Sequence, residues 1–147
     1  MRLYDYAKKK NLFLISDEAY DHLVYDENEK ISLASLDKGE ERPRVISVFT
    51  FSKSFGMAGM RVGYVVGPAD VVTYVRRVST HQIYDLSDLN QGAALAALRQ
   101  PPEEYDHYLN DLVSSYQEAR NLLHTAFEDC PLPPGGAYLY VPFESKE

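Results

Sequence analysis

The sequence predicts an α/β protein built around a small, mostly parallel sheet. Three β-rich runs fall in the first half of the chain, and each ends in polar or glycine-rich residues. After them, apolar residues recur every three to four positions, which is the period of an amphipathic helix. Strands with helices between and after them form the layers of an α/β fold. We therefore expect a sheet with helices packed against it.

The first half of the chain predicts one helix and three strands. Residues 2–10 have a helical apolar face, and 12–15 is a continuous apolar run, typical of a strand buried on both faces of a parallel sheet. Further strands are predicted at 45–50 and 63–67. Residues 26–43 are polar and contain a glycine and a proline, which indicates an excursion over the surface.

The second half predicts mainly helices. Amphipathic segments cover 69–78 and 86–98, and a longer one covers about 103–127 between two proline breaks. At about 1.5 Å per residue, this long helix spans roughly 35–40 Å, enough to connect two lobes. A last apolar run at 137–141 predicts a further strand.

The overall composition is that of a folded, acidic protein. The 147 residues carry 15 Lys+Arg against 22 Asp+Glu, a formal net charge of −7, which argues against nucleic acid or an anionic membrane as a partner. No apolar run approaches the length of a membrane span. The one cysteine, Cys130, cannot form an internal disulfide. These features favour a cytoplasmic protein.

Asp17 and Tyr20 follow the first predicted strand at its carboxyl end. Open α/β sheets bind ligands outside the carboxyl ends of their strands. A carboxylate beside an apolar run can hold a proton or a cationic nitrogen. The alternative is that Asp17 caps the next turn, because aspartate is a favoured capping residue.

The second predicted strand runs directly into a lysine. Lys53 lies among small residues, with the hydroxyl groups of Thr50 and Ser52 beside it. Most lysines are solvated surface charges, but burial would lower the pKa of this amine and make it a nucleophile for Schiff-base chemistry. Arg61 follows two glycines and could bind a phosphate.

These residues lie in strings that resemble a known family. DEAY at 17–20 and TFSKSFGMAGMRVGYVVGP at 50–68 resemble the class I and II aminotransferases of fold type I, which depend on pyridoxal 5′-phosphate. The interval between Asp17 and Lys53 is also the one this family leads us to expect. Two later strings resemble members of the same group: LNQGAALAAL and PPGGAYLYVPF. The resemblance runs from Arg2 to about Phe143.

The resemblance implies a role for each candidate residue. Lys53 would bind the cofactor aldehyde as a Schiff base and then move the proton at the substrate α-carbon. Asp17 would pair with the pyridine nitrogen, and Tyr20 would donate a hydrogen bond to the phenolic oxygen of the ring. The phosphate would be held by three side chains: Thr50, Ser52 and Arg61.

The resemblance also implies the architecture and the activity. Residues 1–100 would be part of a three-layer αβα, cofactor-binding large domain, and 101–147 the connecting helix and the start of a small domain. The implied activity is transamination between an L-amino acid and a 2-oxo acid. The alternatives are a pyridoxal-phosphate-dependent lyase or synthase of the same fold, or a non-catalytic fragment that acts only in assembly.

Several parts of the family pattern do not occur in this sequence. The family's phosphate loop, its ring-stacking aromatic and its Asn-Pro-x-x-Pro-Thr-Gly string would precede Asp17, and the arginine for the substrate carboxylate would follow residue 147. We therefore expect a fragment that forms a homodimer or associates with the remainder of the enzyme. The histidines are scattered without metal-ligand spacing, so no metal site is predicted: His22, His81, His107 and His124.

Overall fold

The computed structural model describes residues 2–127 and 129–142, which divide into two compact units. The sheet unit comprises the chain up to Ala19 together with Ile31–Arg99. The helix unit comprises Tyr20–Lys30 and the chain from Gln100 onward. The polar stretch 26–43, expected as one surface excursion, is thus shared between the two units.

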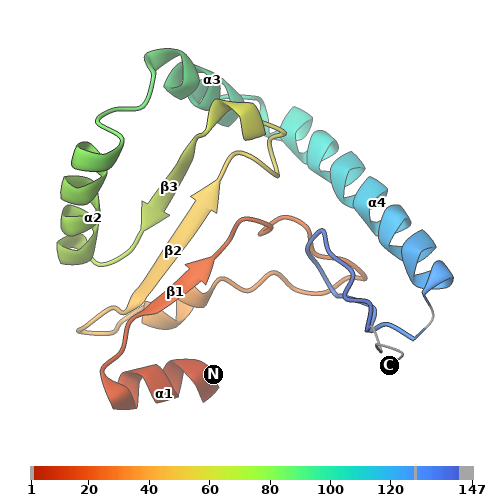
Figure 1. Ribbon diagram of the computed structural model, residues 1–147, viewed down its shortest axis with the longest axis horizontal. Helices are drawn as coiled ribbons and strands as arrows, with labels where there is room; N and C mark the ends of the chain where they lie inside the picture. Colours follow the sequence, from red (N-terminus) through yellow and green to blue (C-terminus); the bar gives the residue numbers. More distant parts are fainter. Residues whose placement is uncertain (1, 128, 143–147) are drawn as a thin grey trace, which may run out of the picture. The chain divides into compact units, whose positions relative to one another are not determined.

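The sheet unit holds most of the regular structure (Figure 1). Its helices, 3₁₀ helices and strands are, in chain order, α1 (Arg2–Lys10), β1 (Leu14–Asp17), η1 (Leu33–Asp37), β2 (Val45–Thr50), η2 (Ala58–Met60), β3 (Gly63–Val66), α2 (Ala69–Gln82) and α3 (Asp88–Leu98). The predicted α/β class is confirmed, and each helix and strand predicted in this unit is found. The boundaries differ by a few residues: β1 starts two residues late, and α2 continues four residues beyond the expected end.

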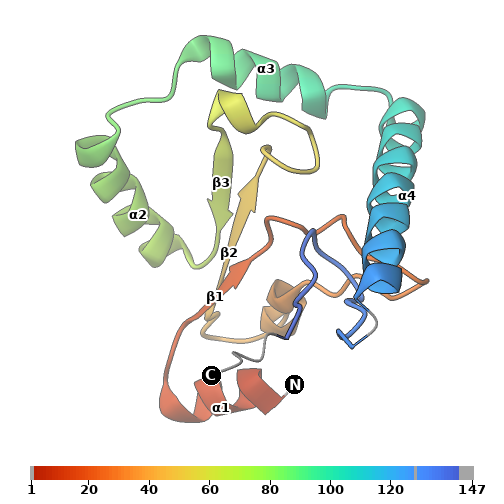
Figure 2. The ribbon, with the colours of Figure 1, turned by 45° about the vertical axis from the view of Figure 1, so that its right-hand side comes forward.

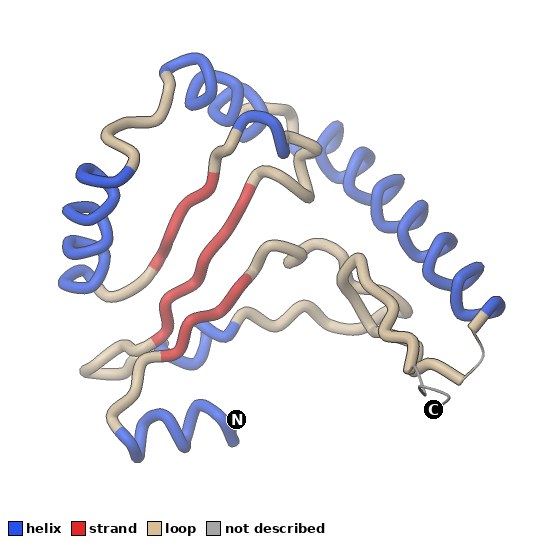
Figure 3. Tube along the Cα trace, in the orientation of Figure 1, coloured by secondary structure: helices blue, strands red, loops and turns tan. Residues whose placement is uncertain are grey.

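The described residues form a three-stranded sheet in the order β1-β2-β3 (Figure 3). β1 and β2 are parallel, with Leu14 opposite Val45, whereas β3 is antiparallel to β2, with Gly63 opposite Thr50. We expected a mostly parallel sheet. The third strand reverses because the connection 51–62 contains only a turn and one 3₁₀ helix, whereas a parallel return needs a long crossover, usually a helix.

The expected burial of the first strand on both faces is wrong for this chain. Ile15 is 74% exposed, and the apolar residues Leu12 and Phe13 just before β1 are about half exposed. Figure 2 shows α2 alongside β3, at the other edge of the sheet from β1. The apolar run is therefore a strand by its composition, and its burial requires a covering layer that the described residues do not provide.

A small core lies directly behind the β2–β3 connection. Phe51, Val62 and Ala94 are buried against one another, so the core joins the end of β2, the start of β3 and α3. Phe55 packs on Phe51 with ring centroids 4.8 Å apart. This core fixes the two ends of the connection that carries the candidate lysine.

The opposite end of β2 is held by Asp37. Its carboxylate accepts hydrogen bonds from the Tyr4 hydroxyl (2.7 Å) and from the backbone amides of Arg44 (2.9 Å) and Val45 (2.7 Å). These bonds join α1 and η1 to the first residue of β2. Asp37 therefore acts as a structural anchor of the sheet unit, away from the residues proposed for chemistry.

The helix unit is built on α4 (Pro102–Ala126), close to the predicted 103–127. A proline and two glutamates occupy its first turn, where a missing amide and negative charge are both tolerated. Residues 23–25 lie along 134–136, with an antiparallel bridge between Val24 and Gly135. In the described stretch 129–142 no strand is formed, so the strand expected at 137–141 is absent from it.

Candidate functional site

The topology of the sheet brings three chain segments to one edge. Parallel strands β1 and β2 both end there, with Asp17 as the last residue of β1 and Thr50 as the last of β2. Because β3 runs the other way, its first residue, Gly63, is at this edge as well, with Arg61 just before it. The antiparallel return is therefore what places the arginine beside the other candidates.

The strand register places the carboxylate and the hydroxyl on one face. Asp17 is level with Val48, and the amide of Glu18 donates to the Val48 carbonyl (2.9 Å). Thr50 lies two residues beyond Val48 on β2, about 7 Å farther along the strand. Because side chains alternate along a strand, residues two apart project from the same face. Asp17 and Thr50 consequently project from the same face of the sheet.

Asp17 is exposed and makes one local hydrogen bond. Its Oδ1 accepts from the backbone amide of Ala19 at 3.0 Å, so the turn-capping interpretation is realised in the structure. A carboxylate has about four acceptor positions on its two oxygens. The cap thus orients the side chain and leaves acceptor capacity for a cationic nitrogen.

The lysine turn is held by backbone bonds. The Lys53 carbonyl accepts from the amide of Gly56 (3.0 Å), and the Phe51 carbonyl accepts from that of Met57 (3.1 Å). Gly56 has φ of 63°, a conformation that favours glycine. Thr50 Oγ1 accepts from the Ser52 amide at 3.1 Å. These bonds fix the backbone from which the lysine extends.

Lys53 is exposed, although the sequence led us to expect a desolvated amine. The residue lies at the outside of the turn, beyond the last residue of β2, whereas Ser54 after it is 2% exposed. The described chain buries the residue next to the lysine but does not bury the lysine. Removal of water from its amine therefore requires a covering segment or chain.

Arg61 occupies a constrained position. Its φ is 54°, in the left-handed region that non-glycine residues rarely adopt, and its Nη1 donates to the Ala58 carbonyl at 2.8 Å. The preceding carbonyl, of Met60, accepts from Asn90 Nδ2 of α3 (2.9 Å). Asn90 was not predicted as a site residue, and its place in LNQGAALAAL gives no signal of a contact with this loop.

Gly63 allows β3 to approach β2 closely at the same edge. A Cβ atom at Gly63 would lie 2.6 Å from the carbonyl oxygen of Phe49, closer than side chains pack. The rings of Phe49 and Tyr64 stack next to it, with centroids 4.8 Å apart. Glycine at this position therefore keeps β3, and with it Arg61, against the end of β2.

The predicted residues fall in both units. Five belong to the edge of the sheet unit: Asp17, Thr50, Ser52, Lys53 and Arg61. Tyr20 belongs to the helix unit, where its hydroxyl donates to the Tyr138 hydroxyl at 2.9 Å. Tyr138 was not predicted, although the string PPGGAYLYVPF that contains it resembles the family.

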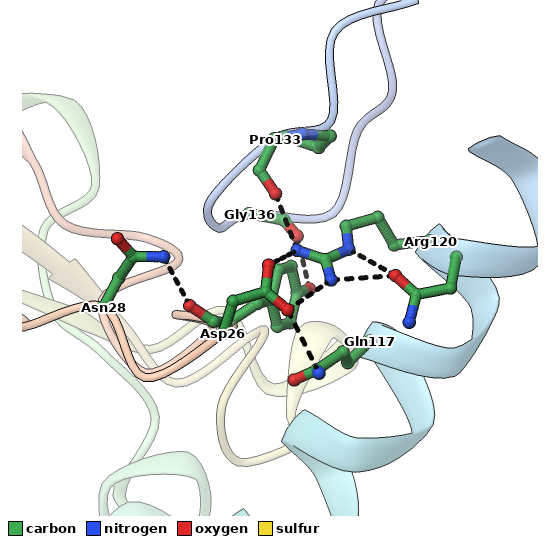
Figure 4. A network of polar contacts seen from close by, with 8 residues as sticks. Asp26, Asn28, Gln117, Arg120, Pro133 and Gly136 are labelled. Atoms are coloured by element: carbon green, nitrogen blue, oxygen red, sulfur yellow. Dashed lines mark hydrogen bonds and ion pairs between the residues drawn. The ribbon is translucent and has the colours of Figure 1, made fainter. Parts of the chain in front are cut away.

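The helix unit contains a polar network around one buried arginine (Figure 4). Arg120 has a side chain only 5% exposed and donates to both carboxylate oxygens of Asp26, at 2.6 and 2.8 Å. This hydrogen-bonded pair lowers the pKa of Asp26 and raises the pKa of Arg120. Because the partners of the guanidinium lie within the unit, the network is structural.

Other kinds of site find no support in the described residues. Across 2–127 and 129–142, no three histidine, cysteine, aspartate or glutamate side chains are placed to hold a metal ion. His22 is partly buried, and burial lowers its pKa, which favours the neutral ring. No described helix combines the length and the apolar character needed to cross a membrane.

Comparison with known proteins assigns the sequence of this chain to a family. The family model for aminotransferase class I and II matches residues 1–146. An aspartate aminotransferase of Thermotoga maritima is 35% identical over 139 residues, which cover 91% of this chain and 34% of that protein. An aspartate aminotransferase of Pinus pinaster is 33% identical over 144 residues, covering 95% of this chain and 29% of that protein.

The folds agree as well. The solved structure of an aromatic aminotransferase from Pyrococcus horikoshii has a TM-score of 0.85 at 28% identity, covering 94% of this chain and 37% of that one. The chain thus spans about a third of the length of these relatives. Over that third, both the sequence and the structure correspond, and the chain belongs to the aminotransferase class I and II family.

Proposed function

We propose that this chain supplies the lysine-bearing part of a pyridoxal-phosphate-dependent enzyme that transfers an amino group between an L-amino acid and a 2-oxo acid. The observation that carries the proposal is the convergence of Asp17, Lys53 and Arg61 at one edge of the sheet. The membership of the aminotransferase family supports it, since members of that family use this cofactor.

The residues at the edge fit the chemical groups of pyridoxal phosphate. The cofactor, when bound, supplies an electron sink for charge that develops at the substrate α-carbon. Its protonated ring nitrogen suits the carboxylate of Asp17, and its aldehyde suits the amine of Lys53. Its phosphate suits a guanidinium and nearby hydroxyl groups: Arg61, Thr50 and Ser52.

Each side chain has a distinct task in the proposed reaction. Asp17 holds the ring nitrogen in its protonated form, because an adjacent carboxylate stabilises a cation. Lys53 would hold the aldehyde of the cofactor, and its amine would carry a proton to and from the substrate α-carbon as a general base and acid. Tyr20 donates a hydrogen bond to the phenolic oxygen. Arg61 anchors the phosphate and so fixes the ring.

The exposure of Lys53 sets a requirement for activity. Proton transfer at the substrate α-carbon calls for an amine shielded from water, because burial lowers the pKa of a lysine side chain. We therefore propose that a second copy of the chain, or the remainder of the enzyme, covers this edge. The acidic charge and the single cysteine favour a cytoplasmic setting for that assembly.

Trapping the cofactor on the chain tests the proposal. The chain is mixed with pyridoxal phosphate, scanned for visible absorbance, reduced with borohydride and mapped by peptide mass. We expect a visible band and label on Lys53, both lost in Lys53→Ala and kept in Lys38→Ala, a change at an exposed lysine away from the edge. Label scattered over surface lysines without a distinct band would contradict the proposal.

A further inference from the structure

The hydroxyl groups of Tyr20 and Tyr138 form a pair within the helix unit. The two oxygens are 2.9 Å apart, with Tyr20 as the donor, and the rings meet edge to face with centroids 5.6 Å apart. Tyr138 is 73% exposed, so the pair lies at the surface of its unit. Two tyrosines from distant parts of the sequence are therefore joined by a hydrogen bond between their hydroxyl groups.

The backbone around the pair is a fixed frame. The amide of Tyr25 donates to the Pro134 carbonyl (2.9 Å), and that of Gly136 donates to the Leu23 carbonyl (2.8 Å). Both bonds flank the antiparallel bridge, and the side chains of Leu23 and Tyr25 are only 2% and 1% exposed. The segments that carry the two tyrosines are thus held side by side by backbone hydrogen bonds.

Arg120 ties both segments to α4, as Figure 4 shows. Its guanidinium binds the Asp26 carboxylate, donates to the Pro133 carbonyl at 2.9 Å and lies 4.7 Å from the centre of the Tyr25 ring. A buried charge with this many partners resists displacement, because breaking the set leaves it unpaired. The two segments that carry the tyrosine pair are consequently joined to α4 through Arg120.

We propose that Tyr138 is a positioning residue that holds the Tyr20 hydroxyl for its role in the cofactor site, an inference that rests on the proposed function. A phenol has one proton to donate and can also accept. When Tyr20 donates to the phenolic oxygen of the cofactor, Tyr138 donates to Tyr20 in turn. Hydrogen bonds in such a chain strengthen one another, so Tyr20 becomes a better donor.

The pairing is tested first without the cofactor. Every tyrosine of the 147-residue chain is labelled with carbon-13 at Cζ, whose NMR signal responds to hydrogen bonding at the attached oxygen. We expect Tyr138→Phe, which removes one oxygen and keeps the ring, to move the Tyr20 signal. Tyr140→Phe, at a residue that is 77% exposed, is the matched control and should leave it in place. An unmoved Tyr20 signal in Tyr138→Phe overturns the proposal.

The reciprocal variant guards against a change of fold. Tyr20→Phe assigns the Tyr20 signal by its loss and should also move the Tyr138 signal, while leaving that of Tyr140 in place. If Tyr138→Phe disturbs the circular dichroism spectrum, this second variant decides the question on its own. A Tyr138 signal that stays in place when the Tyr20 hydroxyl is removed contradicts the pairing.

Adding pyridoxal phosphate separates this proposal from the proposed function. With the cofactor trapped on Lys53, Tyr138→Phe should shift the visible absorption band relative to Tyr140→Phe, because a weaker hydrogen bond reaches the ring oxygen. If the cofactor is trapped on Lys53 and the visible bands of Tyr138→Phe and Tyr140→Phe are identical, the positioning role of Tyr138 is overturned. Failure to trap the cofactor on Lys53 in every variant contradicts the proposed function instead, and the carbon signals alone then decide the pairing.

Discussion

The carboxylate of Asp17 has a structural role and a proposed chemical role, and one substitution can separate the two. In the structure it caps a turn through Ala19, and in the proposed reaction it neutralises the ring nitrogen of the cofactor. The two roles make different demands, because an amide oxygen can still accept the hydrogen bond of the cap but carries no charge. Asparagine at this position therefore separates a structural carboxylate from a chemical one.

We expect Asp17→Asn to leave Lys53 able to bind the cofactor but to slow turnover of the assembled enzyme at least about a hundredfold, because a fixed charge facing the reacting group is lost. Steady-state kinetics and borohydride trapping measure the two effects separately. Asp70→Asn, at an exposed carboxylate in the first turn of α2, is the control and should change neither. Near-normal turnover of Asp17→Asn would remove Asp17 from the mechanism.

The sequence predicts where the candidate side chains lie along the strands but not how they are solvated. Asp17 and Thr50 end two strands as expected, because apolar runs and the polar residues after them mark strand ends. The exposure of Lys53 could not be predicted, since burial depends on what covers the turn. Tyr138 could not be predicted either, because its partner lies 118 residues away.

The anchoring of β2 by Asp37 makes the stability of the sheet unit depend on pH. Burial by itself raises the pKa of Asp37, but the hydrogen bonds from Tyr4 and from the amides of Val45 and Arg44 outweigh it, so the pKa falls below its ordinary value of 3.8. The folded state then binds fewer protons than the unfolded state. The stabilisation that the Asp37 carboxylate gives the folded state is complete above about pH 4. It is lost as the pH falls through 3.8 toward the lower pKa of Asp37 in the folded state.

We expect Asp37→Asn to lower the free energy of unfolding by about 1–3 kcal/mol at neutral pH, because buried amides lose a charged acceptor. Urea denaturation followed by circular dichroism measures the difference, which should shrink below about pH 4 as the native carboxylate is protonated. Glu41→Gln, at an exposed carboxylate nearby, should have no effect at either pH. A difference that stays constant with pH would show that the charge of Asp37 is not what stabilises the junction.

The elements also show which sequence signals are sufficient. Helices α1, α3 and α4 lie within about two residues of their predictions, because periodicity, prolines and charged end turns are local signals. The direction of β3 is not a local property, since it depends on the connection 51–62 folding back on β2. The run at 137–141 has strand composition, but a strand needs a neighbour, and in the described residues only one bridge forms nearby.

Large apolar side chains lie exposed on several of the described elements. β1 lies at an edge of the described sheet and carries Ile15, which is 74% exposed. Tyr84 and Leu89 are 86% and 84% exposed. Single exposed apolar residues are normal, but an apolar strand at a sheet edge also presents unpaired backbone groups to another chain. The chain spans about a third of the length of its relatives.

We therefore expect the chain to self-associate at micromolar concentration and to elute from a sizing column ahead of a 16.7 kDa monomer. Ile15→Lys should shift the chain toward the monomer, because a charge on an edge strand opposes pairing with a second edge. The matched control is Ile31→Lys, which places the same charge at a 71% exposed loop residue and should leave the elution unchanged. A sharp monomer peak for the unaltered chain would show that the apolar edge does not pair with a second copy. The remainder of the enzyme would then be the cover to look for, because the proposed chemistry still requires Lys53 to be desolvated.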